Sequence, residues 1–343
     1  MIAAQPFVDW IACYLPEQFS AREPIELQAL PGDAGFRRYF RVRSEPPVMA
    51  TSAPPSHENV PAFVTKGLAL ARAGVRVPRV YAVDYEHGYL LQEDLGTAVM
   101  AEALRSGAAE TCYRRALEVL RRIQGAEPDP QVFPAYDATL LNEELALFPH
   151  WFIGQLLDVA LSSEEHQLIA AIDTVLVASA EEQPRVVVHR DYHCRNLLPG
   201  LDDLGVVDFQ DAVVGPATYD LVSLLRDCYY RLADPELERY FRQYLDAAAV
   251  PMVARAQWRR WFDLMGLQRH LKVLGIFARL WLRDGKARYL DDLPLVIRYV
   301  LEVAERYPET RPFARWFAAR LLPALVGQPW YRDWQTAGES CAP

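Results

Sequence analysis

The 343-residue chain has few cysteines and no long apolar run. Its five cysteines include no C-x-x-C pair, and they stand at Cys13, Cys112, Cys194, Cys228 and Cys341. This spacing suggests neither a zinc site nor a disulfide framework, so we expect reduced thiols in a cytosol. No apolar stretch reaches the length that a membrane span needs, and the N-terminus lacks the basic segment of a signal peptide. We therefore expect a cytoplasmic protein with no membrane association.

Positive charges are outnumbered by negative ones, with 36 Lys and Arg against 45 Asp and Glu. The formal net charge is -9, whereas a general nucleic-acid binder needs a basic stripe. We therefore expect no nucleic-acid partner, and no obligate protein partner is evident. The negative total does not exclude a nucleotide as a ligand, because a few local cations, backbone amides and a metal ion suffice for a triphosphate.

The pattern of apolar residues divides the chain into a β-rich first part and a helical remainder. Strands are predicted at 25–30, 36–42, 79–83 and 88–92, with one helix over 59–73. A hinge near 92–97 follows. Helices are then predicted at 98–105, 110–124, 140–148, 164–180, 219–232, 235–248, 255–283, 293–306 and 311–325. The fold class expected is α+β and bilobal, with an N-lobe at 1–94, a C-lobe at 95–343 and ligands in the cleft between them.

Two short apolar strands in the C-lobe each end in a carboxylate. The first, at 186–188, leads into His189-Arg190-Asp191, and Asn196 follows five residues after Asp191. The second, at 204–207, ends at Asp208. Asp191 alone would be interpreted first as a turn cap, because Asp is common in turns. Together the three residues match the H-R-D-x-x-x-x-N pattern of kinases, which predicts Asp191 as the catalytic residue and Asn196 and Asp208 as Mg²⁺ ligands.

Two glycines lie in the loop between the first two predicted strands. Gly32 and Gly35 would let a hairpin approach phosphate groups with its backbone amides as donors, although any tight hairpin favours glycine. The next strand carries four arginines: Arg37, Arg38, Arg41 and Arg43. We assign Arg37 as the candidate phosphate contact; the alternative is a solvated strand face.

The predicted hinge supplies the other candidate nucleotide contacts. Backbone N–H and C=O groups of such a linker can read an adenine edge, and Gln92, Glu93 and Leu95 are the candidate residues. The same segment also suits an ordinary linker between lobes, and both interpretations can hold.

Three segments of the C-lobe carry a family resemblance. They are H-R-D-Y-H-C-R-N at 189–196, V-V-D-F-Q-D-A at 206–212 and G-P-A-T-Y-D-L at 215–221. They resemble the aminoglycoside phosphotransferase and choline kinase-like superfamily, which shares the protein-kinase fold, and the likeness covers roughly residues 20–290. It implies ATP and Mg²⁺ as cofactors. A protein kinase would carry a longer activation segment, whereas a helix is predicted here from Tyr219, so the acceptor is expected to be a small molecule.

Further segments narrow the resemblance. Residues 31–42, 147–152 and 268–280 are similar to bacterial anomeric amino-sugar kinases, which act on N-acetylmuramate and N-acetylglucosamine in cell-wall recycling. This implies an amino sugar phosphorylated on its anomeric hydroxyl, with Glu144 and Trp151 as sugar contacts. The lactyl carboxylate of muramate would need a cation, which Arg195, Arg269 or Arg279 could supply. For Trp151 and Arg279 the alternatives are helix packing and a surface pair.

One expected residue is missing. Kinase-fold enzymes usually carry a lysine on the third N-lobe strand, but the strand near 47–51 has none, and Lys66 comes too late to match. The phosphate contact must come from elsewhere, for example from an arginine of 37–43, or be absent. Two alternatives therefore stay open: a non-catalytic binding module, and a kinase of another acceptor such as an aminoglycoside, choline or homoserine. The arginines in 259–283 disfavour a polycationic aminoglycoside.

Overall fold

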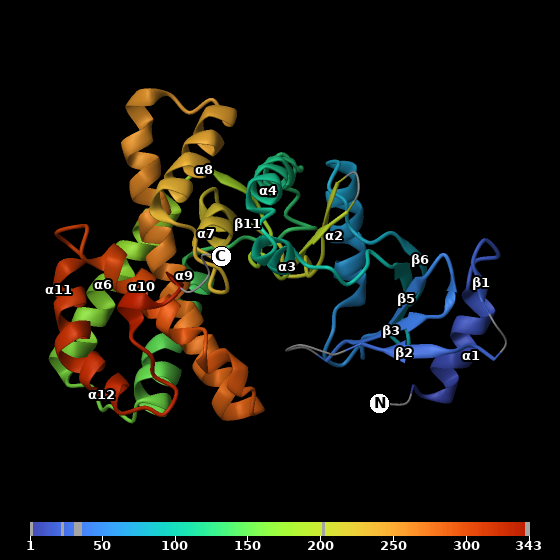
Figure 1. Cartoon of the computed structure of the whole chain (residues 1–343), viewed down its shortest axis with the longest axis horizontal. Helices are drawn as coiled ribbons and strands as arrows, with labels where there is room; N and C mark the ends of the chain where they lie inside the picture. The colour runs from blue at the N-terminus through green and yellow to red at the C-terminus, as the bar shows by residue number, and fades with distance from the viewer. Residues whose placement is uncertain (1–2, 22–23, 31–35, 201–202, 340–343) are drawn as a thin grey trace.

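A computed structural model describes residues 3–21, 24–30, 36–200 and 203–339 of the chain. Figure 1 shows a β-rich lobe at one end of an elongated molecule and a larger helical part at the other. This is the α+β, bilobal arrangement that the sequence predicts. Gly32 and Gly35 lie outside the described residues.

The small lobe is built on a five-stranded antiparallel sheet with the order β2-β3-β5-β7-β6. The strands are β2 Leu27–Ala29, β3 Arg38–Val42, β5 Val48–Ser52, β6 Val80–Asp84 and β7 Tyr89–Glu93. A two-stranded ribbon of β1 Ser20–Ala21 and β4 Ser44–Glu45 lies beside it. The antiparallel pairing of β2 with β3 confirms the predicted hairpin.

The two faces of this sheet differ, because successive side chains of a strand point to opposite sides. One face packs against helix α1, Gln5–Tyr14, where Phe7 joins Phe40 and Leu91 in a separate apolar core. The other face carries Thr51 and Gln92 and points toward helix α2 and the large lobe.

Helix α2, Val60–Arg72, crosses the cleft side of the sheet (Figure 1). It begins at Asn59, whose side chain accepts a hydrogen bond from the Ala62 amide at 3.0 Å. It ends before Gly74, which has a φ of 79°. Such a left-handed conformation favours glycine, so the helix stops where the sequence predicts.

The large lobe is organised around one long helix, α9, Arg255–Asp284, of 30 residues. Its middle is buried on all sides, as expected for a helix in the centre of a lobe. The other helices are α3 Met100–Arg105, α4 Ala109–Gln124, α5 Ala138–Leu145, α6 Ser163–Glu181, α7 Tyr219–Leu225, α8 Asp234–Ala247, α10 Leu293–Ala304, α11 Arg311–Trp316 and α12 Leu322–Val326. None of the helices in the described ranges is both long and apolar enough to cross a membrane.

Three predicted helices differ from the structure. The helix expected at 140–148 ends at Leu145 and is followed by a π-helical segment, Phe148–Leu156. A second π-helical turn, Phe317–Leu321, interrupts the helix expected at 311–325. The helix expected at 219–232 ends at Leu225, where Arg226 leaves helical geometry, and Asp227 follows beside the loop after the strand at 185–188. There Asp227 accepts hydrogen bonds from the amides of Cys194, at 2.8 Å, and Tyr229, at 2.9 Å.

Two short antiparallel ribbons carry the C-lobe motifs. Strand β8, Arg185–Val188, pairs with β11, Val213–Pro216. Strand β9, Leu197–Pro199, pairs with β10, Leu204–Val206. The two predicted strands are therefore present, but each pairs with a different neighbour, and the loops that follow β8 and β10 converge.

Candidate active site

The loop after β8 is fixed by a buried carboxylate. Asp220, at the start of α7, accepts hydrogen bonds from the backbone amides of His189, at 2.7 Å, and Arg190, at 3.0 Å. The Nε2 atom of His189 lies 3.0 Å from the Val207 carbonyl, which links this loop to the one after β10. Burial lowers the pKa of His189, so its ring is neutral near pH 7 and acts as a scaffold.

Asp191, Asn196 and Asp208 lie together where these loops meet. The Asn196 amide nitrogen donates to the Asp191 carbonyl at 3.0 Å and to a carboxylate oxygen of Asp208 at 3.4 Å. Gln210 donates to the other oxygen of Asp208 at 2.6 Å. The three residues that the sequence pattern singles out therefore lie close together in the structure.

The two carboxylates of this cluster differ in electrostatics. Burial alone would raise the pKa of Asp191, but the cations around it, Lys272 foremost, lower it to about 2. The pKa of Asp208 is raised, because the surrounding protein desolvates it and Asp191 repels its charge. Asp191 is therefore ionised near pH 7, whereas Asp208 gains from a nearby cation.

The cluster suits a magnesium ion that also takes phosphate oxygens. Asp208 is exposed to the cleft. Asn196 uses its nitrogen for both of its side-chain bonds, and no described residue donates to its Oδ1 atom. Within the described ranges no group of three or more His, Cys, Asp or Glu side chains could hold a metal alone. Mg²⁺ commonly combines one or two carboxylates with substrate phosphates and water, which fits this donor set.

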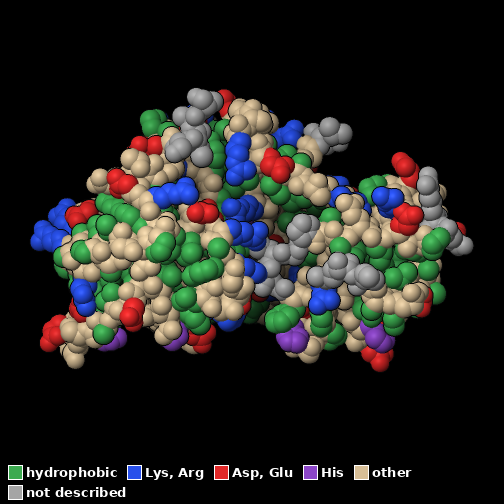
Figure 2. Space-filling model, turned by 60° about the horizontal axis from the view of Figure 1, so that its bottom comes forward, with side chains coloured by type: hydrophobic (Ala, Val, Ile, Leu, Met, Phe, Trp, Pro, Cys, Tyr) green, Lys and Arg blue, Asp and Glu red, His purple; other side chains and the backbone are tan. Residues whose placement is uncertain are grey.

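A cavity of about 220 Å³ opens beside Asp191. Aromatic rings and cations line it together, including Tyr229, Phe277, Tyr289, Arg195, Arg269 and Lys272. Figure 2 shows basic side chains gathered in the hollow between the two halves of the molecule. Two of the three predicted carboxylate-binding arginines thus line a pocket that also contains Asp191.

The described lining of this pocket does not include Glu144, Trp151 or Arg279. Trp151 packs against the main core, with its ring edge-on to His150. Arg279 is half-buried on α9, and burial and the nearby Arg283 lower its pKa. In the described structure these side chains lie in packing positions around the pocket.

Glu144 is enclosed by protein, whereas a sugar contact would need a side chain that is open to the pocket. It is buried, accepts hydrogen bonds from Tyr136 and Arg190, and lies 2.9 Å from the Lys272 ammonium. Lys272 in turn donates to the Tyr219 hydroxyl at 3.0 Å. Sequence reasoning missed Lys272, although it follows Arg269 by three residues and so shares a face of α9.

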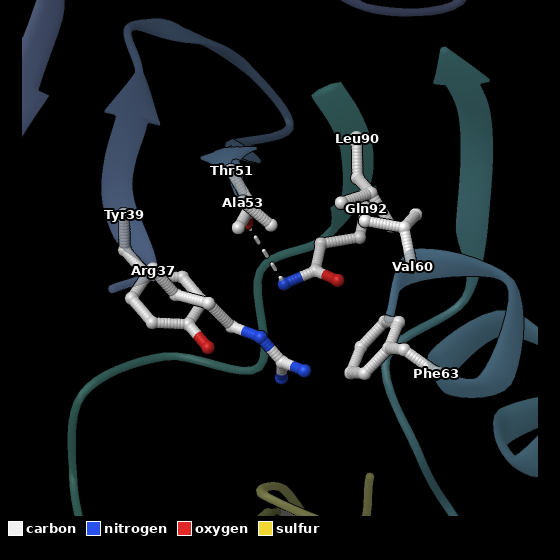
Figure 3. Close-up of a pocket in the computed structure, with 8 residues that line it drawn as sticks. All are labelled: Arg37, Tyr39, Thr51, Ala53, Val60, Phe63, Leu90 and Gln92. Atoms are coloured by element: carbon white, nitrogen blue, oxygen red, sulfur yellow. Dashed lines mark hydrogen bonds between the residues drawn. The ribbon is translucent and has the colours of Figure 1, made fainter. Parts of the chain in front are cut away.

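On the N-lobe side, Arg37 points into a small cavity beneath the sheet (Figure 3). Gln92 lines the same cavity, and its amide nitrogen donates to Thr51 at 3.4 Å. Glu93 instead pairs with Arg76 at 2.5 Å at the C-terminal end of β7. Leu95 packs against β10, where a Cβ on Gly205 would lie 2.9 Å from its side chain.

An ion pair that the sequence does not predict connects the hinge to the sheet. Arg41 of β3 binds Asp94 through two hydrogen bonds, one of them at 2.9 Å. Asp94 also accepts the Gly96 amide at 2.8 Å. The pair therefore fixes the linker against the sheet.

A two-lobed fold with a cleft that contains Asp191, Asn196 and Asp208 defines a kinase-like phosphotransferase. Residues 26–261 match the phosphotransferase enzyme family. The chain is 42% identical over 310 residues to the N-acetylmuramate/N-acetylglucosamine kinase of Pseudomonas aeruginosa, covering 88% of this chain and 91% of that protein. It belongs to the phosphotransferase enzyme family and is a small-molecule phosphotransferase.

Solved structures show the same fold at low identity. A choline kinase from Cryptosporidium parvum Iowa II has a TM-score of 0.61 and 12% identity, covering 92% of this chain and 99% of that one. The ADP-bound aminoglycoside phosphotransferase APH(2'')-Ib has a TM-score of 0.54 and 16% identity, covering 86% and 98%. Both similarities show that the fold is shared.

Proposed function

We propose that this protein is an ATP- and Mg²⁺-dependent kinase that phosphorylates the anomeric hydroxyl of N-acetylmuramate or N-acetylglucosamine. The product would be the sugar 1-phosphate of cell-wall recycling. The observation that carries the proposal is a pocket of cations and aromatic rings beside Asp191, in a chain 42% identical to a relative of that name. ATP is supported by the ADP-bound neighbour of the same fold.

Asp191 would act on the acceptor. Its carboxylate lines the pocket and is ionised, since its pKa is lowered to about 2. It orients the anomeric hydroxyl and accepts its proton as the new O–P bond forms. Phosphoryl transfer passes through a loose transition state, so orientation matters more than the basicity of the carboxylate. Asp208 and Asn196 would hold Mg²⁺, which neutralises phosphate charge when it is bound.

Arg269 is the strongest candidate for the lactyl carboxylate of N-acetylmuramate. It is buried, donates to the Cys228 sulfur at 3.5 Å, and its Nε atom has no hydrogen-bond partner among the described residues. Arg195 is less available, because it stacks on Tyr229 and lies 3.6 Å from Asp292. A buried guanidinium with an open donor fits a carboxylate well.

The same cations disfavour the alternative acceptors choline and aminoglycosides. Arg269 and Lys272 both lie in the pocket wall, and a cationic acceptor would meet like charge there. The sugar contacts expected from Glu144 and Trp151 stay predictions.

The test is to incubate the protein with ATP, Mg²⁺ and a panel of acceptors, and to follow ADP release. The panel contains both amino sugars, choline, homoserine and an aminoglycoside. We expect turnover with the amino sugars, and a phosphorus NMR signal coupled to the anomeric proton. Phosphate at another position would contradict the anomeric assignment. Nucleotide binding without turnover on any acceptor would favour the non-catalytic binding module.

A further inference from the structure

The third strand of the small-lobe sheet has no lysine, and another cation occupies the cavity that this strand faces. Thr51 of β5 faces the cavity beneath the sheet, where a strand lysine would be expected. Figure 3 shows the guanidinium of Arg37 in this cavity, between the rings of Tyr39 and Phe63. Its central carbon lies 4.9 Å from the centre of the Phe63 ring. A cation is therefore present, but it comes from the residue just before the neighbouring strand β3.

Arg37 has two polar partners that are distant in the sequence. Its Nε atom lies 2.9 Å from Glu58, and the two side chains are only 10% and 15% exposed. Its Nη1 atom donates to the side-chain oxygen of Gln210 at 2.8 Å. Glu58 directly precedes Asn59, the residue that caps α2. Arg37 thus joins the sheet, the start of α2 and the loop after β10.

Gln210 connects these N-lobe contacts to the metal-binding carboxylate. Its side-chain nitrogen donates to Asp208 at 2.6 Å, while its side-chain oxygen accepts from Arg37. Its backbone carbonyl accepts a 2.6 Å hydrogen bond from the buried ammonium of Lys66, on α2. Because an amide has a donor end and an acceptor end, Arg37 and Asp208 together allow only one orientation of this side chain.

We propose that Arg37, Glu58, Lys66 and Gln210 form a clamp that positions the Asp208 carboxylate from the N-lobe. In kinases with a strand lysine, a lysine–glutamate ion pair must be in place together with the metal-binding aspartate. Here Arg37 and Glu58 form the ion pair. Gln210 bonds both Arg37 and Asp208, so the position of Arg37 determines where the Asp208 carboxylate is held. The inference rests on the proposed function in one respect, that Asp208 is a metal ligand.

The clamp is tested by measuring ADP binding by calorimetry over a range of Mg²⁺ concentrations. Arg37→Ala and Gln210→Ala should each raise the Mg²⁺ concentration for half-maximal ADP binding about tenfold, since each loses a hydrogen bond to a charged group. Arg43→Ala is the matched control, because Arg43 forms an exposed ion pair with Glu26 on the same sheet at 2.8 Å. It should leave the Mg²⁺ dependence unchanged.

A second measurement does not depend on a bound ligand. Amide hydrogen exchange of residues 207–212 in the free protein should become faster in Arg37→Ala and Gln210→Ala, and remain unchanged in Arg43→Ala. Gln210→Glu keeps the acceptor for Arg37 but loses the donor to Asp208, so exchange of residues 207–212 in the free protein should again become faster. If Arg37→Ala does not fold, Glu58→Gln and Gln210→Ala carry the test.

Unchanged Mg²⁺ dependence and unchanged exchange in the folded variants would overturn the clamp. This failure is distinguishable from failure of the proposed function. A wild-type protein that binds ADP with Mg²⁺ but phosphorylates neither amino sugar contradicts the proposed acceptor, while the comparison among the variants still decides the clamp.

Discussion

The ammonium of Lys272 lies 2.9 Å from a carboxylate oxygen of Glu144, and their side chains are only 9% and 7% exposed. Arg190 donates to the same oxygen. Glu144 belongs to α5 and Lys272 to α9, so the contact joins two helices beneath the acceptor pocket. Arg190 directly precedes Asp191, and the proposed catalytic residue is therefore held next to a buried network of charges.

Removing Lys272 should destabilise the protein strongly. Lys272→Met leaves Glu144 buried with Arg190 as its remaining cation, and breaking a buried ion pair costs about 3–5 kcal/mol. The free energy of unfolding in urea measures the loss. Arg114→Ala is the control, since it removes an exposed helical pair with Glu118 and should cost less than about 1 kcal/mol. Equal costs for Lys272→Met and Arg114→Ala would refute the inference.

Acid should weaken the same network. Burial tends to raise the pKa of Glu144, but Lys272 and Arg190 outweigh it, so the pKa is lowered in the folded protein. The stabilisation is then present above the unfolded pKa of about 4.3 and is lost as pH falls through the folded pKa. Urea unfolding between pH 3 and pH 7 should show wild-type stability approaching that of Glu144→Gln at the acid end. A constant difference would contradict this assignment.

Asp191→Asn should abolish phosphoryl transfer and spare nucleotide binding. Loss of a positioned proton acceptor costs about 10²–10⁴-fold in rate. Asn196 and Asp208, the proposed Mg²⁺ ligands, are kept in this variant, so ADP affinity measured by calorimetry should stay close to that of the wild type. Asp246→Asn, an exposed position on α8, serves as the control. Turnover retained in Asp191→Asn would remove Asp191 from the catalytic role.

The parts of the site that could be predicted are those that share one short segment. Asp191 and Asn196 are five residues apart, and a hydrogen bond from Asn196 to the Asp191 carbonyl fixes their relation within the loop. Arg37 and Gln210 are 173 residues apart, and no local pattern predicts their contact. The contact depends on how the lobes pack, which periodicity does not encode.

The ends of helices could likewise be predicted only where the residues that determine them are close in the sequence. The start of α2 could be predicted because Asn59 supplies its own cap. The end of α7 could not, since Asp227 just beyond it also accepts from the amide of Cys194, which is 33 residues away in the sequence. Periodicity also continues through residues 311–325, where a π-helical turn inserts without a change in the apolar pattern.

Gly275→Ala should destabilise the large lobe. Gly275 lies on α9 where the chain before the π-helical segment crosses closely, and an added Cβ would lie 2.4 Å from the Leu147 carbonyl carbon. Backbone atoms cannot move aside as a flexible side chain can, so the overpacking should cost about 1–3 kcal/mol or more. The midpoint of urea unfolding measures it. Gly327→Ala is the control, because its nearest atom would lie at an ordinary 3.7 Å. Equal stabilities would show that the two segments separate easily.

Arg269→Met should discriminate between the two amino sugars. Arg269 lines the acceptor pocket, and only N-acetylmuramate carries a carboxylate for it. Loss of a hydrogen bond between charged groups costs about 1.5–3 kcal/mol, or roughly 10–150-fold in kcat/KM for that sugar. The value for N-acetylglucosamine should change much less. Arg279→Met is the matched control from the same helix, and it should leave the ratio of the two kcat/KM values as in the wild type. A loss for N-acetylmuramate in Arg279→Met, with Arg269→Met unaffected, would assign the carboxylate to Arg279 instead.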